Sequence, residues 1–240
     1  MFSHEFRTTS QELLPPEHSS WPAQGQGPIE FTKGERRTRF LLERHNGRML
    51  RSLLLAPPGA GKGTQGARIA AIYGVSHIAT GDLLREQVER CTPTGEAAVG
   101  YMARGDLAPD PLVMALVVER IAALEPPAGF VLDGFPRTIA QAEQAYAWGS
   151  EHDLTFHAVI ALDVPEDQLV QRVVLRGETS CRGDDTAETV LRRIHLYAET
   201  SEPLLEFYRS RGILIEIDGT GTVEEVTERI RARLDALDLR

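Results

Sequence analysis

The chain has 240 residues, of which 42% are hydrophobic, enough to bury the core of one large α/β domain or two small ones. Its net charge of -9 argues against a broad surface for nucleic acid or membranes, so any attraction for phosphate must come from local arginines. No apolar run approaches the roughly 18 residues of a membrane span and no secretion signal is evident, so we expect a cytoplasmic protein.

Residues 1–48 are polar, contain several prolines and show no sustained helical or strand period. This composition predicts a disordered extension. The acidic residues Glu5, Glu12 and Glu17 argue against an organellar transit peptide. Alternatively, Met49, which directly precedes the first apolar run, is the natural start, and the sequence is compatible with both interpretations.

From residue 50, short apolar runs alternate with helix-length segments, which predicts a parallel sheet with crossover helices. The predicted strands span residues 50–55, 75–78, 129–132, 158–162 and 213–217. Helix starts are indicated by Pro165 with Glu166 and Asp167, by Asp185 with Glu188, and by Thr222 with Glu225. The pattern predicts one doubly wound α/β domain, whose ligands bind beyond the carboxyl ends of the strands.

The first predicted strand leads into a glycine-rich turn, residues 56–64, with the sequence APPGAGKGT. The turn departs twice from the pattern G-x-x-x-x-G-K-[ST], because Ala56 replaces the first glycine and Gly63 separates Lys62 from Thr64. Its glycines allow N–H groups to point inward, and the next helix adds its positive end, so we expect an anion cradle. Lys62 would contact the outer phosphates and Thr64 could ligate magnesium. Apart from Lys33, Lys62 is the only lysine in the chain.

The turns after the second and third predicted strands carry further charged residues. In the stretch TGDLLR, Thr80 or Asp82 taken alone could be an N-cap and Arg85 a surface charge. In LDGFPRT, Asp133 ends an apolar strand as a magnesium-shell carboxylate would, and Arg137 follows the turn. Two arginines beyond adjacent strands indicate a second anionic ligand.

From about Met49 to the C-terminus, these motifs together resemble the adenylate kinase family. The phosphate loop of that family, G-x-P-G-x-G-K-G-T, accounts for the separated Lys62 and Thr64 and leaves only Ala56 as a departure. TGDLLR, LDGFPRT and Gln141 follow at the places and in the order of the family. The resemblance implies reversible transfer of the ATP γ-phosphoryl group to AMP, giving two ADP, on a five-stranded P-loop kinase fold.

The resemblance also implies the site residues. The ATP side would consist of Gly59, Ala60, Gly61, Lys62, Gly63, Thr64, Arg172, Arg176 and Gly221, the last through its backbone carbonyl at adenine. The AMP side would consist of Thr80, Arg85, Asp106, Leu107, Ala108, Gly134, Phe135, Pro136, Arg137, Gln141, Arg182 and Arg193, with an AMP-binding segment at about 79–108. The charges acting on the transferred group would be Lys62, Arg85, Arg137, Arg176, Arg182 and Arg193, and Mg²⁺ with ATP would lie near Thr64 and Asp133, mainly through water.

A mobile lid is expected at about 173–185, where only five residues separate Arg176 from Arg182. This spacing resembles the short-lid subgroup and leaves no room for a zinc-binding or β-rich insertion. Cys91 and Cys181 also lack partners at metal-ligand spacing, so we expect no zinc. Taken alone, the lid arginines could equally form a solvated loop.

Two alternatives remain open at this stage. A UMP/CMP kinase on the same fold usually has alanine at the TGD threonine, so Thr80 and Gln141 favour adenine. A catalytically weakened nucleotide-binding sensor is suggested by Ala56, although a second set of arginines would be useless to a protein that binds one nucleotide. We therefore expect a monomer that binds ATP and AMP or ADP, without nucleic acid or membrane partners.

Overall fold

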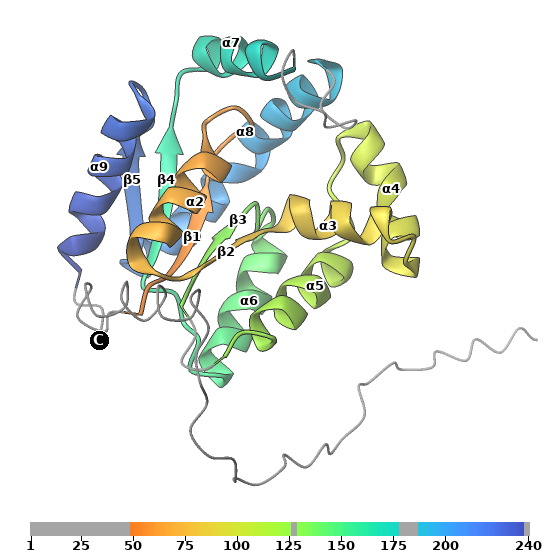
Figure 1. The fold of residues 1–240 in the computed structure, drawn as a ribbon, viewed down its shortest axis with the longest axis horizontal. Helices are drawn as coiled ribbons and strands as arrows, with labels where there is room; N and C mark the ends of the chain where they lie inside the picture. Colours follow the sequence, from red (N-terminus) through yellow and green to blue (C-terminus); the bar gives the residue numbers. More distant parts are fainter. Residues whose placement is uncertain (1–48, 126–128, 178–186, 238–240) are drawn as a thin grey trace, which may run out of the picture.

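The computed structural model describes residues 49–125, 129–177 and 187–237 (Figure 1). The predicted N-terminal extension, residues 1–48, lies outside the described residues. The same holds for most of the predicted lid, including Arg182 and the expected helix start at Asp185. For residues 173–177 only the helical backbone is described.

A five-stranded parallel sheet forms the centre of the described domain, with strand order β2-β3-β1-β4-β5. The strands are β1 (Arg51–Leu55), β2 (Ser76–Ala79), β3 (Phe130–Asp133), β4 (Ala158–Asp163) and β5 (Leu214–Asp218). All five predicted strands are confirmed, with ends that differ by at most one residue. The chain leaves β1 and β3 in opposite directions along the sheet, and this arrangement opens a crevice at their carboxyl ends.

Helices cover both faces of the sheet (Figure 1). They are α2 (Lys62–Tyr73), α3 (Thr80–Glu89), α4 (Pro93–Arg104), α5 (Asp110–Ala122), α6 (Ile139–Glu151), α7 (Glu166–Gly177), α8 (Ala187–Arg209) and α9 (Val223–Asp235). Leu54 and Ile160 lie in the core under α2 and α9, whereas Leu53 and Val159 lie in the core with α5, α6 and the second half of α8. This alternation follows from the two-residue period of a strand buried on both faces.

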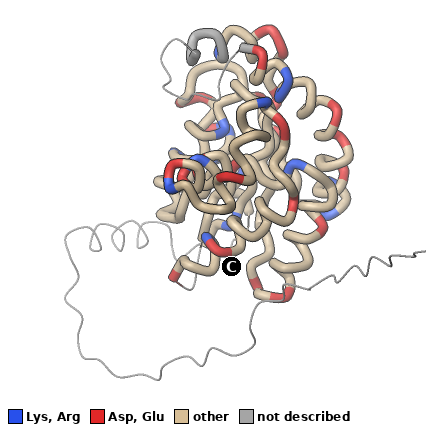
Figure 2. The backbone as a smooth tube through the Cα atoms, turned by 90° about the vertical axis from the view of Figure 1, so that its right-hand side faces the viewer, with Lys and Arg blue, Asp and Glu red and all other residues tan. Residues whose placement is uncertain are grey.

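Two of the helix starts predicted from the sequence are present in the described residues. Thr222 and Glu225 form a full capping box at the start of α9, and α7 begins at Glu166 with two acidic residues in its first turn. None of the helices in the described ranges is long and apolar enough to cross a membrane. Figure 2 shows basic and acidic positions interspersed along the described backbone.

Candidate active site

A cavity of about 800 Å³ lies at the carboxyl ends of β1 and β3, and a smaller cavity of about 70 Å³ adjoins it. The predicted residues that line the larger one are Gly59, Gly61, Lys62, Gly63, Thr64, Arg85, Leu107, Asp133, Gly134, Pro136, Arg137, Arg172 and Arg193. The predicted residues that line the smaller one are Thr80, Arg85, Asp106, Leu107, Ala108, Gly134, Arg137, Gln141 and Arg193. The two sets share three arginines, so the cavities adjoin along these side chains.

Among the predicted residues whose side chains the structure describes, three lie away from these linings. The side chains of Ala60 and Phe135 belong to the hydrophobic cores, where they are 2% and 0% exposed. Gly221 lies in the loop after β5, beyond the residues that line the two cavities. These residues could contact a nucleotide only through their backbone atoms or after a movement of the loop.

The glycine-rich turn folds as a loop that ends at the N-terminus of α2. Gly59 and Gly61 have φ angles of 86° and 91°, which only glycine adopts readily, and Gly61 is the N-cap of α2. The ammonium group of Lys62 donates hydrogen bonds to the carbonyl oxygens of Ala56, at 2.5 Å, and Pro57, at 3.1 Å. The lysine is thereby held over the loop, with the positive end of α2 behind it.

Ala56, the one residue that departs from the phosphate loop expected from the resemblance, lies within this structure without backbone strain. Among the described non-glycine residues only Cys91 and Asp153 have positive φ angles. Ala56 is thus outside the left-handed region, as expected for a residue before proline. Its side chain is 4% exposed and belongs to the hydrophobic core.

The carboxylate of Asp133 closes the floor of the cavity beside the phosphate loop. A Cβ atom added to Gly63 would lie 3.7 Å from Asp133 Oδ2, so the loop and the carboxylate are in close proximity. Thr64, which follows, is exposed to the cavity. In the described part of the chain no three His, Cys, Asp or Glu side chains are grouped so as to hold a metal ion. One carboxylate, one hydroxyl and nucleotide phosphates nevertheless fit Mg²⁺, which usually keeps several waters.

Sequence reasoning missed His77, which lines the cavity from β2. Its Nε2 atom is buried without a hydrogen bond and lies 4.0 Å from Asp133 Oδ2. A Cβ atom on Gly66 would come within 2.5 Å of this nitrogen, so α2 packs directly over the ring. The sequence signal was weak, because a single histidine in a strand resembles a core residue.

Three arginines from different elements converge where the cavities meet. Arg137 donates from Nε to the Gly134 carbonyl at 2.8 Å, and Arg193 donates to the Met102 carbonyl at 3.3 Å. Arg85 forms an ion pair with Asp82. The side chain of Arg137 is open to the cavity, but the protein around its guanidinium desolvates it and so lowers its pKa. The charges of Arg193 and Arg85 lower this pKa further, whereas the carboxylate of Asp133 raises it. Such crowding of like charges favours an anionic ligand.

The turn after β3 is built around a close approach of Gly134 to Thr80. Gly134 has a φ angle of 80°, and a Cβ atom there would lie 2.8 Å from Thr80 Oγ1. Thr80 begins α3, but its N-cap is Ala79 and no side chain caps the helix. The Thr80 hydroxyl instead donates to the Asp133 carbonyl at 3.2 Å and joins the ends of β2 and β3. Neither Thr80 nor Asp82 is therefore the N-cap that the sequence allowed.

Gln141 is held by two neighbours at the far end of the smaller cavity. Its Oε1 accepts from the Arg137 backbone N–H at 2.7 Å, and its Nε2 donates to Asp110 Oδ1 at 2.7 Å. Sequence reasoning missed Asp110. The stretch Pro109-Asp110-Pro111 shows only that a helix begins there, and the partner 31 residues away could not be inferred from it.

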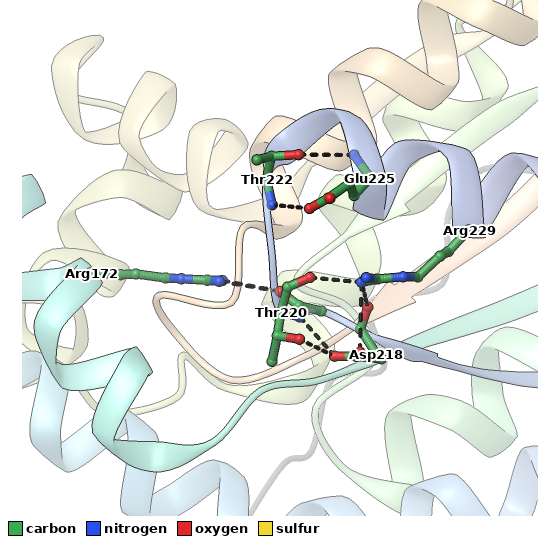
Figure 3. A network of polar contacts seen from close by, with 7 residues as sticks. Arg172, Asp218, Thr220, Thr222, Glu225 and Arg229 are labelled. Atoms are coloured by element: carbon green, nitrogen blue, oxygen red, sulfur yellow. Dashed lines mark hydrogen bonds and ion pairs between the residues drawn. The ribbon is translucent and has the colours of Figure 1, made fainter.

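The loop after β5 is fixed by the network of polar contacts in Figure 3. Arg172, which lines the larger cavity, donates to the Gly219 carbonyl at 3.2 Å and 3.3 Å. Arg229 reaches the carbonyls of Asp218, at 2.8 Å, and Thr220, at 2.6 Å. The hydroxyl and backbone N–H of Thr220, with the Arg229 charge as a smaller cause, lower the pKa of the Asp218 carboxyl.

Arg176, the first of the predicted lid arginines, lies within α7, but its side chain is outside what the structure describes. Arg182 lies wholly outside it. Their assignment to the site therefore remains a prediction from the sequence.

A parallel sheet with a glycine loop before α2, and with cations gathered around one cavity, defines a P-loop protein that binds phosphorylated ligands. A sequence model of the family Adenylate kinase matches residues 54–213. The adenylate kinase of Thermus thermophilus is 46% identical over 182 residues, which are 76% of this chain and 95% of that protein. Those of Micrococcus luteus and Porphyromonas gingivalis are 43% and 40% identical over 76% and 78% of this chain and 89% and 96% of those proteins. The chain belongs to the adenylate kinase family.

Proposed function

We propose that the two adjoining cavities carry out the reaction of the family, reversible transfer of the γ-phosphoryl group from ATP to AMP. The observation that carries this proposal is that a cavity lined by the phosphate loop adjoins a second cavity, with three arginines between them. Two phosphorylated ligands, one in each cavity, would then have their phosphates at the same arginines. The relatives named adenylate kinase do not favour the UMP/CMP kinase or the weakened sensor.

In this proposal the phosphate loop, Gly59–Thr64, holds the ATP phosphates, and Lys62 acts on the outer ones. Arg85, Arg137 and Arg193 hold the AMP phosphate and the group in transit, together with the lid residues Arg176 and Arg182. Arg172 belongs to the ATP side, and the carbonyl of Gly221 contacts the adenine of ATP. Phosphoryl transfer needs two nucleotides in line and stabilisation of charge on the equatorial oxygens, which these cations would supply without a covalent intermediate.

Mg²⁺ bound with ATP would neutralise phosphate charge, and Thr64 and Asp133 are the residues that would hold it, mainly through water. The closeness of Asp133 Oδ2 to Gly63 supports this assignment. Asp133 is 8% exposed, so its carboxylate is already largely desolvated beside the loop. We propose no zinc.

Water competes with AMP as the acceptor, which is a reason for a lid to close before the chemistry. We assign that role to residues 173–185 and the binding of AMP to the segment 79–108, which contains α3 and α4. Both ends of the site come from a single chain, which supports a monomer. We also propose that the protein acts in the cytoplasm, as the sequence led us to expect. Analytical ultracentrifugation would test the monomer.

A coupled assay of the purified chain with ATP and each of AMP, CMP, UMP and GMP would test the proposed function. We expect AMP to be the preferred acceptor by a wide margin. Equal or faster turnover with CMP or UMP would identify a UMP/CMP kinase instead. Binding of ATP without transfer to any of the four would identify a nucleotide sensor.

A further inference from the structure

The carboxamide of Gln141 is buried and bonded on two sides. The residue is 2% exposed, and it lines the smaller cavity from the first turn of α6. Its oxygen accepts from the Arg137 backbone N–H and its nitrogen donates to Asp110, both at 2.7 Å. Both bonds run to atoms that have only one hydrogen-bonding role.

The chemistry of these two partners decides which end of the amide is oxygen and which is nitrogen. A backbone N–H can only donate, and a carboxylate can only accept. If the Gln141 amide turned over, its nitrogen would face the Arg137 N–H and its oxygen would face the carboxylate of Asp110. Donor would then meet donor and acceptor would meet acceptor, so the network itself assigns a single orientation.

Asp110 is in turn fixed by a second bond. Its Oδ2 accepts from the Thr138 hydroxyl at 2.9 Å, and the same hydroxyl caps α6 by accepting from the Gln141 backbone N–H at 3.1 Å. Asp110 lies at the first position of α5, where the positive end of the helix favours a carboxylate. The starts of α5 and α6 are therefore joined around the amide.

A glutamine carboxamide can donate two hydrogen bonds and accept two. The two described bonds leave one N–H and one oxygen lone pair for a ligand in the cavity. On both edges of adenine that carry the amino group, this donor lies beside a ring nitrogen that is an acceptor. The amino group can therefore donate to the Gln141 oxygen while the ring nitrogen accepts from the Gln141 N–H. A 6-oxopurine such as hypoxanthine or guanine has an acceptor in place of the amino group, and it would meet the amide oxygen with an acceptor.

We propose that Asp110 is a positioning residue that determines the choice of acceptor base, because it holds the Gln141 amide in the orientation that fits adenine and opposes a 6-oxopurine. The proposal rests on the proposed function, in which Gln141 lies at the base of AMP. Asp110 lines neither cavity, so in this proposal it acts on the base only through Gln141.

The test compares Asp110→Ala with the unmodified full chain, using AMP and IMP as acceptors at saturating ATP. Without the carboxylate, the nitrogen of the amide has no fixed acceptor and the orientation is no longer imposed. We expect the preference for AMP over IMP, measured as the ratio of kcat/KM values, to fall about tenfold or more. The KM for ATP should stay within about twofold of the unmodified value, since only the acceptor base is affected.

Two further variants separate orientation from charge and from folding. Asp110→Asn can still turn its oxygen toward Gln141, so most of the AMP preference should remain. Glu119→Ala removes the same charge from an exposed position on α5 and should leave the ratio unchanged. If Asp110→Ala does not fold, Asp110→Ser replaces it, because a hydroxyl both donates and accepts and imposes no orientation.

The proposal is overturned if Asp110→Ala, or its serine substitute, loses activity with AMP and IMP in equal proportion, whatever its melting temperature. It is also overturned if the asparagine variant loses the preference as fully as the alanine variant. Failure of the proposed function looks different, because the unmodified chain would then not use AMP as its preferred acceptor.

Discussion

At the acceptor end of the cavity two buried side chains, Thr80 and Gln141, make polar contacts, whereas the polar contacts of the loop after β5, at the donor end, lie near solvent. Thr80 and Gln141 are 3% and 2% exposed. The Thr80 hydroxyl bonds to the end of β3, and the Gln141 amide nitrogen bonds to the start of α5. In the loop after β5, Asp218, Thr220 and Arg229 are bonded to one another near solvent (Figure 3).

The two kinds of contact should respond differently to substitution. A buried polar group that loses its partner costs about 1–3 kcal/mol, while an exposed ion pair contributes about 0–1 kcal/mol. The exposed loop is also held redundantly, by Arg229, by Arg172, by the side chain of Asp218 and by the capping box at Thr222. Single changes should therefore be severe at the acceptor end and mild in the loop.

The largest effect is expected at the phosphate loop, between the two ends. Lys62→Met should lower kcat by about 10³-fold or more, because the lysine's charge acts on the phosphates as the group is transferred. The fold should be unaffected, since the ammonium donates to two loop carbonyls, those of Ala56 and Pro57, and Lys62 is not part of either hydrophobic core. Steady-state kinetics and circular dichroism would measure both.

Arg68→Met is the matched control, because this arginine lies on the same helix and forms an exposed ion pair with Glu224. Its turnover should match the unmodified chain. Turnover of Lys62→Met close to the unmodified value would remove the phosphate loop from the proposed mechanism.

Gln141→Ala tests the buried polar contacts at the acceptor end. It should raise the KM for AMP about tenfold or more, with a much smaller effect on the KM for ATP. It should also lower the melting temperature by a few degrees, because Asp110 and the Arg137 N–H both lose a buried partner. Gln144→Ala, at an exposed position of the same helix, is the control. An equal rise in both KM values would show that Gln141 does not belong to one end of the site.

Arg229→Ala tests the mild response of the donor loop. The KM for ATP should rise by no more than about fivefold, because several other contacts keep the loop in place. Arg231→Ala, which removes an exposed pair with Glu228 on the same helix, should have no effect. A rise of more than about tenfold for Arg229→Ala alone would contradict the expected difference between the two ends of the site. One arginine near solvent would then be as important as a buried partner.

The sequence was sufficient to predict the sheet and the phosphate loop, because both depend on local patterns. Apolar runs bounded by turn residues marked all five strands, and the spacing around Lys62 marked the anion cradle. Such patterns could not predict partners that the fold brings together from distant parts of the chain. Asp110 bonds to Gln141, and His77 lies 4.0 Å from Asp133, only because β2, β3 and the starts of α5 and α6 meet in space. Thr80 was compatible with an N-cap for the same reason, since the competing acceptor lies 53 residues away.

The smallest effect is expected at Ala56, the one departure from the phosphate loop of the family. An alanine held at positive φ would cost roughly 1 kcal/mol or more, but Ala56 is not among the described residues with positive φ, and the following Pro57 favours an extended conformation. Its carbonyl already accepts from Lys62, an interaction that a glycine would provide equally well. Ala56→Gly should therefore change the affinity for ATP by less than about threefold, well below the tenfold that 1.4 kcal/mol produces. Calorimetric titration of ATP into both variants would measure it, with AMP as the reference ligand. A gain of tenfold or more in the glycine variant would mean that the natural loop is impaired, and it would favour a weakened nucleotide sensor over an efficient kinase.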